Sequence, residues 1–198
     1  NSVDRFCYCI RGGFGGVQGL GVDRLSGWMK KFGLSAKTGI DLSGENAGFV
    51  PTKEWREERG GHWYIGDTYN LSIGQGDLLV TPLQVNAYTT AIAMKGRWFV
   101  PHVVQKDIIA RPSVEAPVEN FEIVRAGMRD CVTEGSCRSL SDLPMPAAGK
   151  TGTAQGHDDK NTHAWFTSFA PFDAPEVAVT VLIEEGGEGS SFAAPVAK

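Results

Sequence analysis

Hydrophobic positions recur at helical spacing over much of the first 135 residues and at strand spacing near the end of the chain. Apolar residues three and four positions apart indicate amphipathic helices, whereas short apolar runs bounded by turn residues indicate strands. The helices predicted from this pattern cover residues 4–11, 23–32, 81–96 and 119–133, and a short one begins near 51. The predicted strands cover 147–155, 163–172 and 176–184, with a strand or hairpin edge over 97–109. Segment 56–72, which is charged and broken by glycine, is expected to be irregular.

Capping and turn residues predict where the main helix of this region begins and ends. Thr81-Pro82-Leu83-Gln84 is a capping box with proline at the first helical position, so a helix is expected to begin there and to end at Gly96. The expected apolar face of this helix is Leu83, Tyr88, Ala91 and Ile92, and that of the 119–133 helix is Phe121, Val124, Met128 and Val132. Ile73-Gly74-Gln75-Gly76 predicts a tight turn.

The order of these elements predicts an α+β fold, with a helical part over about residues 1–135 and a sheet part over about 145–198. The sheet is expected to be antiparallel and three-stranded, because Asp173-Ala174-Pro175 predicts a hairpin turn between its last two strands. Val177–Ile183 is a continuous apolar run, which is typical of a strand buried on both faces.

Composition narrows the function classes. The 198 residues are 41% hydrophobic and 21% charged, which is globular rather than disordered, and the net charge of −4 comes without a basic stripe. Nucleic-acid binding is therefore not expected. No apolar run is long enough to span a membrane and no signal peptide opens the chain, whose first residues resemble the middle of a domain. We expect the chain to be a piece of a longer protein.

The cysteines and histidines do not predict a metal site, and no cofactor is expected. Cys7 and Cys9 lack a matching pair, and Cys131 and Cys137 lack histidines at zinc-site spacing. We favour the interpretation that all four cysteines are small buried hydrophobic residues. A disulfide between Cys131 and Cys137 is the alternative, and it requires a location outside the cytoplasm.

The most informative stretch is Gly149-Lys150-Thr151-Gly152-Thr153. On a strand, Lys150 and Gly152 point to one face, whereas Thr151 and Thr153 point to the other. An anionic peptide end laid along this edge would find hydroxyls, backbone N–H groups and an ammonium. A phosphate-binding loop is rejected because Pro144 stands where that motif needs glycine, and a simple surface turn is the remaining alternative.

A second group gives this strand a chemical context. Ser2-x-Asp4 opens the helical part, and a hydroxyl and a carboxylate at a helix start, facing a cationic strand, suit acyl transfer by an activated serine. With further motifs in the same order, the chain resembles the transpeptidase domain of class B penicillin-binding proteins, most closely the elongation type, or penicillin-binding protein 2. The motifs that carry the resemblance are Ser2–Asp4, Thr38–Leu42, Gly66–Thr68, Ile73–Gly76, Thr81–Gln84, Gly149–Gln155, Gly186-Gly187 and Ala194–Ala197.

The resemblance implies a serine-type D,D-transpeptidase of peptidoglycan synthesis, which cross-links stem peptides through a serine acyl-enzyme and is acylated by β-lactam antibiotics. It also implies a penicillin-binding, serine-transpeptidase-like fold, of which this chain holds the helical subdomain and about three of five strands. Such families carry Ser-x-x-Lys, Ser-x-Asn or Asp, and Lys-Thr-Gly. The second motif matches Ser2 and Asp4, and the third matches Lys150, Thr151 and Gly152.

The first motif is absent, since no serine of this chain has lysine three residues later. By similarity, the nucleophile lies upstream on a helix that this chain lacks. We therefore expect these 198 residues alone to be inactive and poorly stable. A β-lactam-sensing or non-catalytic scaffold domain of the same fold stays open, and so does a serine β-lactamase, which the segment 66–84 disfavours.

The resemblance assigns roles to two residues at the start of the chain. The Ser2 hydroxyl would relay a proton between the lysine of the missing motif and the leaving amine, although a helix-capping serine is the alternative. Asp4 stands where asparagine is common in the family. A carboxylate there favours the charged form of nearby lysines, which works against a lysine that acts as a base.

The remaining implied roles belong to the strand. Lys150 would attract the terminal carboxylate of the substrate, and the Thr151 and Thr153 hydroxyls would hydrogen-bond it. The Thr153 N–H would be an oxyanion donor, and Gly152 would leave room for the substrate backbone to pair as an added strand.

Partners and location are implied in the same way. Peptidoglycan stem peptides and β-lactam antibiotics would be the ligands, and the cell-elongation machinery with a glycosyltransferase would be the protein partners. The expected location is the extracytoplasmic side of the bacterial cell membrane, with an anchor that is not in this chain.

Overall fold

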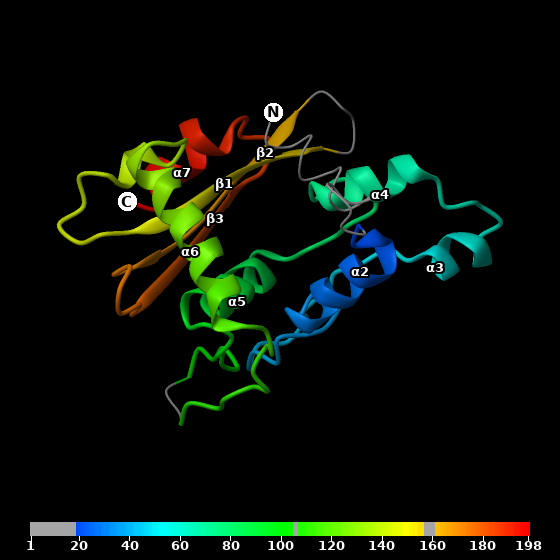
Figure 1. Ribbon diagram of the computed structural model, residues 1–198, viewed down its shortest axis with the longest axis horizontal. Coiled ribbons are helices and arrows are strands. Elements are labelled where there is room, and N and C mark those ends of the chain that lie inside the picture. The colour runs from blue at the N-terminus through cyan, green and yellow to red at the C-terminus, as the bar shows by residue number, and fades with distance from the viewer. Residues whose placement is uncertain (1–18, 105–106, 157–160) are drawn as a thin grey trace. The chain divides into compact units, whose positions relative to one another are not determined.

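The computed structural model describes residues 19–104, 107–156 and 161–198, which form two compact units (Figure 1). The first unit combines residues up to Lys37 with Asn46–Val80, and the second combines Thr38–Glu45 with Thr81–Lys198. The helix predicted over 4–11 and the site residues Ser2 and Asp4 lie outside the described residues. No helix in the described ranges is both long enough and apolar enough to cross a membrane.

The first unit consists of three helices: α2 (Gly21–Lys31), α3 (Lys53–Glu58) and α4 (Ile65–Ser72). The predictions of α2 and α3 are confirmed, and the Thr52 side chain caps α3 by accepting the N–H of Trp55. The prediction that 56–72 is irregular is wrong, because α4 occupies its second half. Asp67 starts this helix by accepting the Tyr64 N–H at 2.7 Å, and this bond offsets the weak helix propensity of Gly66.

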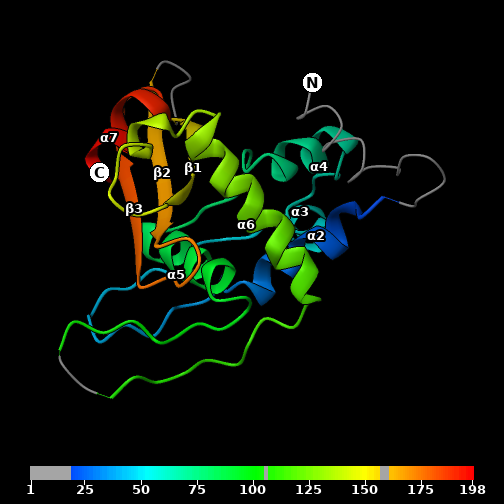
Figure 2. The ribbon, with the colours of Figure 1, turned by 60° about the vertical axis from the view of Figure 1, so that its left-hand side comes forward.

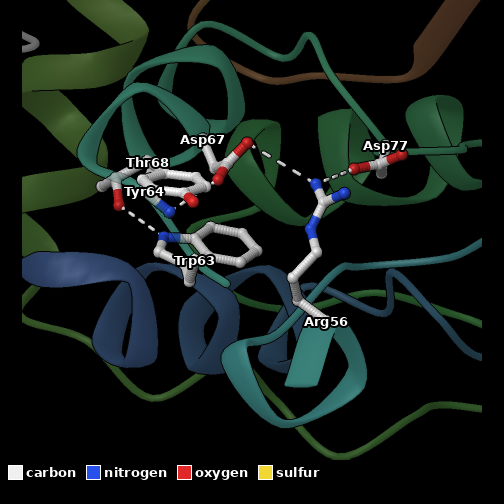
Figure 3. A network of polar contacts seen from close by, with 6 residues as sticks. All are labelled: Arg56, Trp63, Tyr64, Asp67, Thr68 and Asp77. Atoms are coloured by element: carbon white, nitrogen blue, oxygen red, sulfur yellow. Dashed lines mark hydrogen bonds and ion pairs between the residues drawn. The ribbon is translucent and has the colours of Figure 1, made fainter. Parts of the chain in front are cut away.

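Arg56 links the three segments of this unit that follow α2, as Figure 3 shows. Its Nη2 lies 2.5 Å from Asp77 Oδ2, beyond the Ile73–Gly76 turn, and 3.5 Å from Asp67 Oδ1 on α4. Gly74 and Gly76 both have φ of 78°, so the predicted tight turn is confirmed in a conformation that favours glycine. In the same close-up, Trp63 donates to the Thr68 hydroxyl at 2.8 Å.

The second unit contains α5 (Pro82–Ala93), α6 (Val118–Thr133) and an antiparallel sheet of β1 (Ala148–Gln155), β2 (Thr162–Ala170) and β3 (Val177–Ile183). The sheet is antiparallel and three-stranded, as predicted, and its strand order is β1-β2-β3. The capping box at the start of α5 is also confirmed, since Thr81 accepts the Gln84 N–H and Gln84 Oε1 accepts the Thr81 N–H at 3.0 Å. In the described part of the predicted edge 97–109, an isolated antiparallel bridge joins Phe99 to Ala110.

The two faces of the sheet bury different groups. On one face, Phe169 and Ala148 pack with Ala93 of α5 and Met128 of α6. On the other, Phe166 packs with residues of the α6 end and with the segments that follow it: Val132, Cys137, Leu140, Ala193 and Ala194. Helix α6 therefore passes along β1 and contacts both faces, and Figure 2 shows it beside that strand.

Polar groups take buried positions on both helices, and one burial prediction is wrong. The predicted apolar face of α5 is half-buried or buried throughout, and Thr89 is fully buried as well: it bonds Thr167, which in turn bonds Thr180 of β3. On α6, Val124 is exposed and Arg125 is buried, because its guanidinium donates to the carbonyls of Ala93 and Phe172. Hydrogen bonding offsets the desolvation of these groups.

Strand β3 is not buried on both faces: its described residues are half-buried or exposed. One side of its backbone pairs with β2, and within the described residues no further strand pairs with the other side. The apolar run therefore reports strand propensity rather than complete burial.

The cysteine interpretation is wrong for one pair, because Cys131 and Cys137 form a disulfide. Cys7 and Cys9 lie outside the described residues. The bridge spans the end of α6 and is followed by the short 3-10 helix η1 (Arg138–Leu140). After β3, a π-type turn η2 (Gly189–Ala193) leads into the short helix α7 (Ala194–Val196).

Candidate functional site

The Lys-Thr-Gly segment lies on β1, at one edge of the described sheet. The register shows which backbone groups of β1 face β2. The Gly156 N–H donates to the Asn161 carbonyl at 2.9 Å, so every second residue from Gly156 back to Lys150 directs its N–H and C=O groups toward β2. Thr151 and Thr153 consequently direct theirs away from β2. The carbonyl of Ala147, in the same alternation, accepts from Arg129 of α6 at 2.7 Å, which supports this assignment.

Lys150 lies at this outer side of the strand. Its ammonium donates to the outward carbonyl of Thr151 at 2.6 Å. Although the side chain is exposed, the surrounding protein removes enough water to hold the pKa of Lys150 below its ordinary value. Within the described residues no carboxylate forms an ion pair with it, so Lys150 can present its charge to an anionic ligand.

The two threonine hydroxyls lie on the face opposite Lys150, as predicted, and each has a neighbour from a loop outside the strand. Thr151 Oγ1 is 2.7 Å from Ser136 Oγ. Thr153 Oγ1 accepts the backbone N–H of Gly189 at 3.4 Å. The structure therefore places hydroxyl groups and outward N–H groups along one strand edge, next to an ammonium.

Gly152 is where other parts of the chain approach the strand. A Cβ at Gly152 would lie 3.2 Å from the Trp165 Cβ, and a Cβ at Gly189 would lie only 2.3 Å from the Gly152 carbonyl oxygen. The backbone of Gly189 thus packs directly on β1. This contact requires glycine at 189, whereas at Gly152 the close Trp165 Cβ leaves little room for a side chain.

Ser2 and Asp4 cannot be placed against this strand, since both lie outside the described residues. Ser136 is a further neighbour of the site, and the sequence pattern did not indicate it. The signal for it was weak: a serine beside one of two cysteines that were interpreted as unpaired. Among the described residues, no group of His, Cys, Asp and Glu side chains could hold a metal ion.

Comparison with known proteins places this geometry in a family. The sequence-family model of the penicillin-binding protein transpeptidase domain matches residues 16–198 of this chain. Peptidoglycan D,D-transpeptidase MrdA of Haemophilus influenzae is 37% identical, with 90% of this chain and 32% of the relative covered. MrdA of Escherichia coli K12 is 33% identical, with 95% of this chain and 33% of the relative covered.

Solved structures with a similar fold belong to the same family. Penicillin-binding protein 2 of Pseudomonas aeruginosa superposes with a TM-score of 0.79 at 38% identity, covering 89% of this chain and 42% of that one. The Helicobacter pylori protein gives 0.81 at 34% identity, covering 89% and 34%. This chain spans about a third of the length of the curated relatives. Because the family model covers nearly all of it, the chain belongs to the penicillin-binding protein transpeptidase domain family.

Proposed function

We propose that the protein containing this chain is a peptidoglycan D,D-transpeptidase, which cross-links stem peptides through a serine acyl-enzyme and is acylated by β-lactams. The observation that carries the proposal is the exposed edge of β1, where the Lys150 ammonium, two threonine hydroxyls and outward backbone N–H groups lie together. Relatives over the same residues bear the name peptidoglycan D,D-transpeptidase.

The proposed mechanism uses this edge to bind and to stabilise charge. The ammonium of Lys150 attracts the terminal carboxylate of a stem peptide, and the Thr151 and Thr153 hydroxyls orient it. The Thr153 N–H stabilises the developing oxyanion, a contribution worth about 3 kcal/mol for one donor in other enzymes. Ser2 relays the proton to the leaving amine, and Asp4 holds a lysine of the site in position.

The nucleophile is not among these 198 residues, since the chain has no Ser-x-x-Lys sequence. The proposal therefore places the acylated serine in another segment of the longer protein. It also places that protein on the extracytoplasmic side of the cell membrane, where the Cys131–Cys137 disulfide is compatible with an oxidising compartment.

Protein partners are proposed from two of the structural relatives. One is a complex of penicillin-binding protein 2 with MreC from Helicobacter pylori, and another belongs to a peptidoglycan synthase complex that coordinates polymerization and crosslinking. We extend to this protein an elongation complex that contains a glycosyltransferase.

The test is covalent labelling of the full-length protein by a fluorescent penicillin. Lys150→Ala is expected to slow acylation by at least about a hundredfold, because the carboxylate of the drug loses its cationic partner in a partly desolvated site. Lys198→Ala is the matched control, since Lys198 pairs with Asp142 at the surface and should leave labelling unchanged. Near-normal labelling of the Lys150→Ala protein would remove the assignment.

A further inference from the structure

Ser136 lies in a rigid loop beside the Lys-Thr-Gly strand. The disulfide between Cys131 and Cys137 closes this loop, with their Cα atoms 5.1 Å apart. Inside it, the Cys137 N–H donates to the Cys131 carbonyl at 2.9 Å. A Cβ at Gly135 would lie 2.8 Å from the Cys131 Cα, so the turn leaves no room for a side chain there. The position of Ser136 is thus fixed by covalent, hydrogen-bonded and steric constraints together.

The Ser136 hydroxyl has two neighbours, and they differ as acceptors. Its Oγ lies 2.7 Å from Thr151 Oγ1 and 3.5 Å from Cys131 Sγ. The bridged sulfur carries no hydrogen and accepts weakly, whereas a hydroxyl oxygen is a good acceptor. The 2.7 Å contact is compatible with either hydroxyl as its donor, and we assign the donor to Ser136 because the sulfur offers it only a weak acceptor. In this arrangement the hydrogen of the Thr151 hydroxyl stays available for another acceptor.

We propose that Ser136 is a positioning residue that directs the Thr151 hydroxyl toward the carboxylate of the ligand. The inference rests on the proposed function, because it concerns how that site selects substrates with a terminal carboxylate. Hydrogen bonds in a chain polarise one another, so donation from Ser136 makes Thr151 a stronger donor. Ser136 does not touch the ligand itself: it fixes the direction in which Thr151 donates.

The test measures the acylation rate constant of the full-length protein with benzylpenicillin and with its methyl ester, which lacks the carboxylate charge. Ser136→Ala is expected to slow acylation by benzylpenicillin about fivefold, the usual effect of one hydrogen bond, and to leave the rate with the ester unchanged. Ser136→Thr keeps the hydroxyl and should restore the rate. Ser141→Ala is the matched control, because Ser141 is an exposed serine just beyond the same loop.

A double substitution separates positioning from general support of the fold. If Ser136 acts through Thr151, then Ser136→Ala has no further effect in a Thr151→Val protein. Equal slowing with benzylpenicillin and the ester, or full additivity of the two substitutions, would show a merely structural role and overturn the inference.

The outcomes also distinguish this inference from the proposed function. If the unmodified protein is not acylated at all, the proposed function fails and the inference fails with it. If the unmodified protein is acylated and the Ser136→Ala protein reacts equally fast with benzylpenicillin, only the inference is overturned. Thermal melting of each variant confirms that the compared proteins are folded.

Discussion

At the scale of single residues, the protonation of Lys150 links the structure to a measurable pH dependence. Burial in its surroundings lowers the pKa of Lys150, so the ammonium loses its proton at a lower pH than an ordinary lysine does. Acylation of the full-length protein should therefore decline on the alkaline side at a pH below that ordinary range. Lys150→Arg keeps a charge that does not titrate there, and it should move this decline to higher pH. The prediction would be contradicted if the acylation rates of the unmodified and Lys150→Arg proteins declined over the same alkaline pH range.

Asp4 should affect the same alkaline decline of the acylation rate, but by raising the pKa of lysine rather than lowering it. In the proposed site, its carboxylate favours the charged form of nearby lysines and so raises their pKa. Asp4→Asn removes this effect, and the alkaline decline of acylation is expected to move to lower pH. Rate profiles of the full-length protein before and after the substitution provide the measurement. Unchanged acylation across pH would leave Asp4 without a role in protonation.

At the scale of elements, the start of α5 carries a prediction about stability. The Thr81 side chain accepts the Gln84 N–H at 3.2 Å, and its loss leaves that donor without its cap. Thr81→Ala should reduce stability by about 1 kcal/mol, the usual cost of losing such a cap. Faster hydrogen exchange in the first turn of α5 and a lower melting temperature would both report it. Thr133→Ala, at an exposed helix end with two long side-chain bonds of 3.4 Å, is the control with little expected effect.

The same elements show which features a sequence specifies locally. The start of α5 was predictable because Thr81, Pro82 and Gln84 act within one turn, whereas the helix ends at Ala93, before the predicted Gly96. Burial of Arg125 was not predictable, since its acceptors, the carbonyls of Ala93 and Phe172, come from distant segments. Helix α4 was missed because one short-range bond, from the Tyr64 N–H to Asp67, outweighs its glycine.

The candidate site divides in the same way. Lys150, Thr151 and Thr153 could be placed on a strand from alternation alone, and their faces were predicted correctly. Their neighbours could not be predicted, because Ser136 reaches Thr151 only through the loop closed by the Cys131–Cys137 disulfide. Local pattern thus identifies the Lys-Thr-Gly strand, whereas tertiary packing decides which residues support it.

For the molecule as a whole, the outer side of β3 is an unpaired edge of the described sheet. The register directs the backbone groups of Ala178, Thr180 and Leu182 away from β2, and Asn86 covers only the Ala178 carbonyl, at 3.1 Å. An apolar strand with an open edge pairs readily with other chains. We therefore expect the isolated 198-residue chain to aggregate, and the family resemblance predicts that further strands pair here in the longer protein.

Proline substitution tests both halves of this expectation. Leu182→Pro removes an outward N–H, so it should reduce aggregation of the isolated chain, measured by light scattering, because it blocks added strands. In the longer protein it should lower the melting temperature, since a pairing strand loses its donor. Val181→Pro is the matched control: its N–H faces Phe166 of β2, and it should destabilise both forms. A longer protein that tolerates Leu182→Pro without loss of stability would mean that this edge stays unpaired there too.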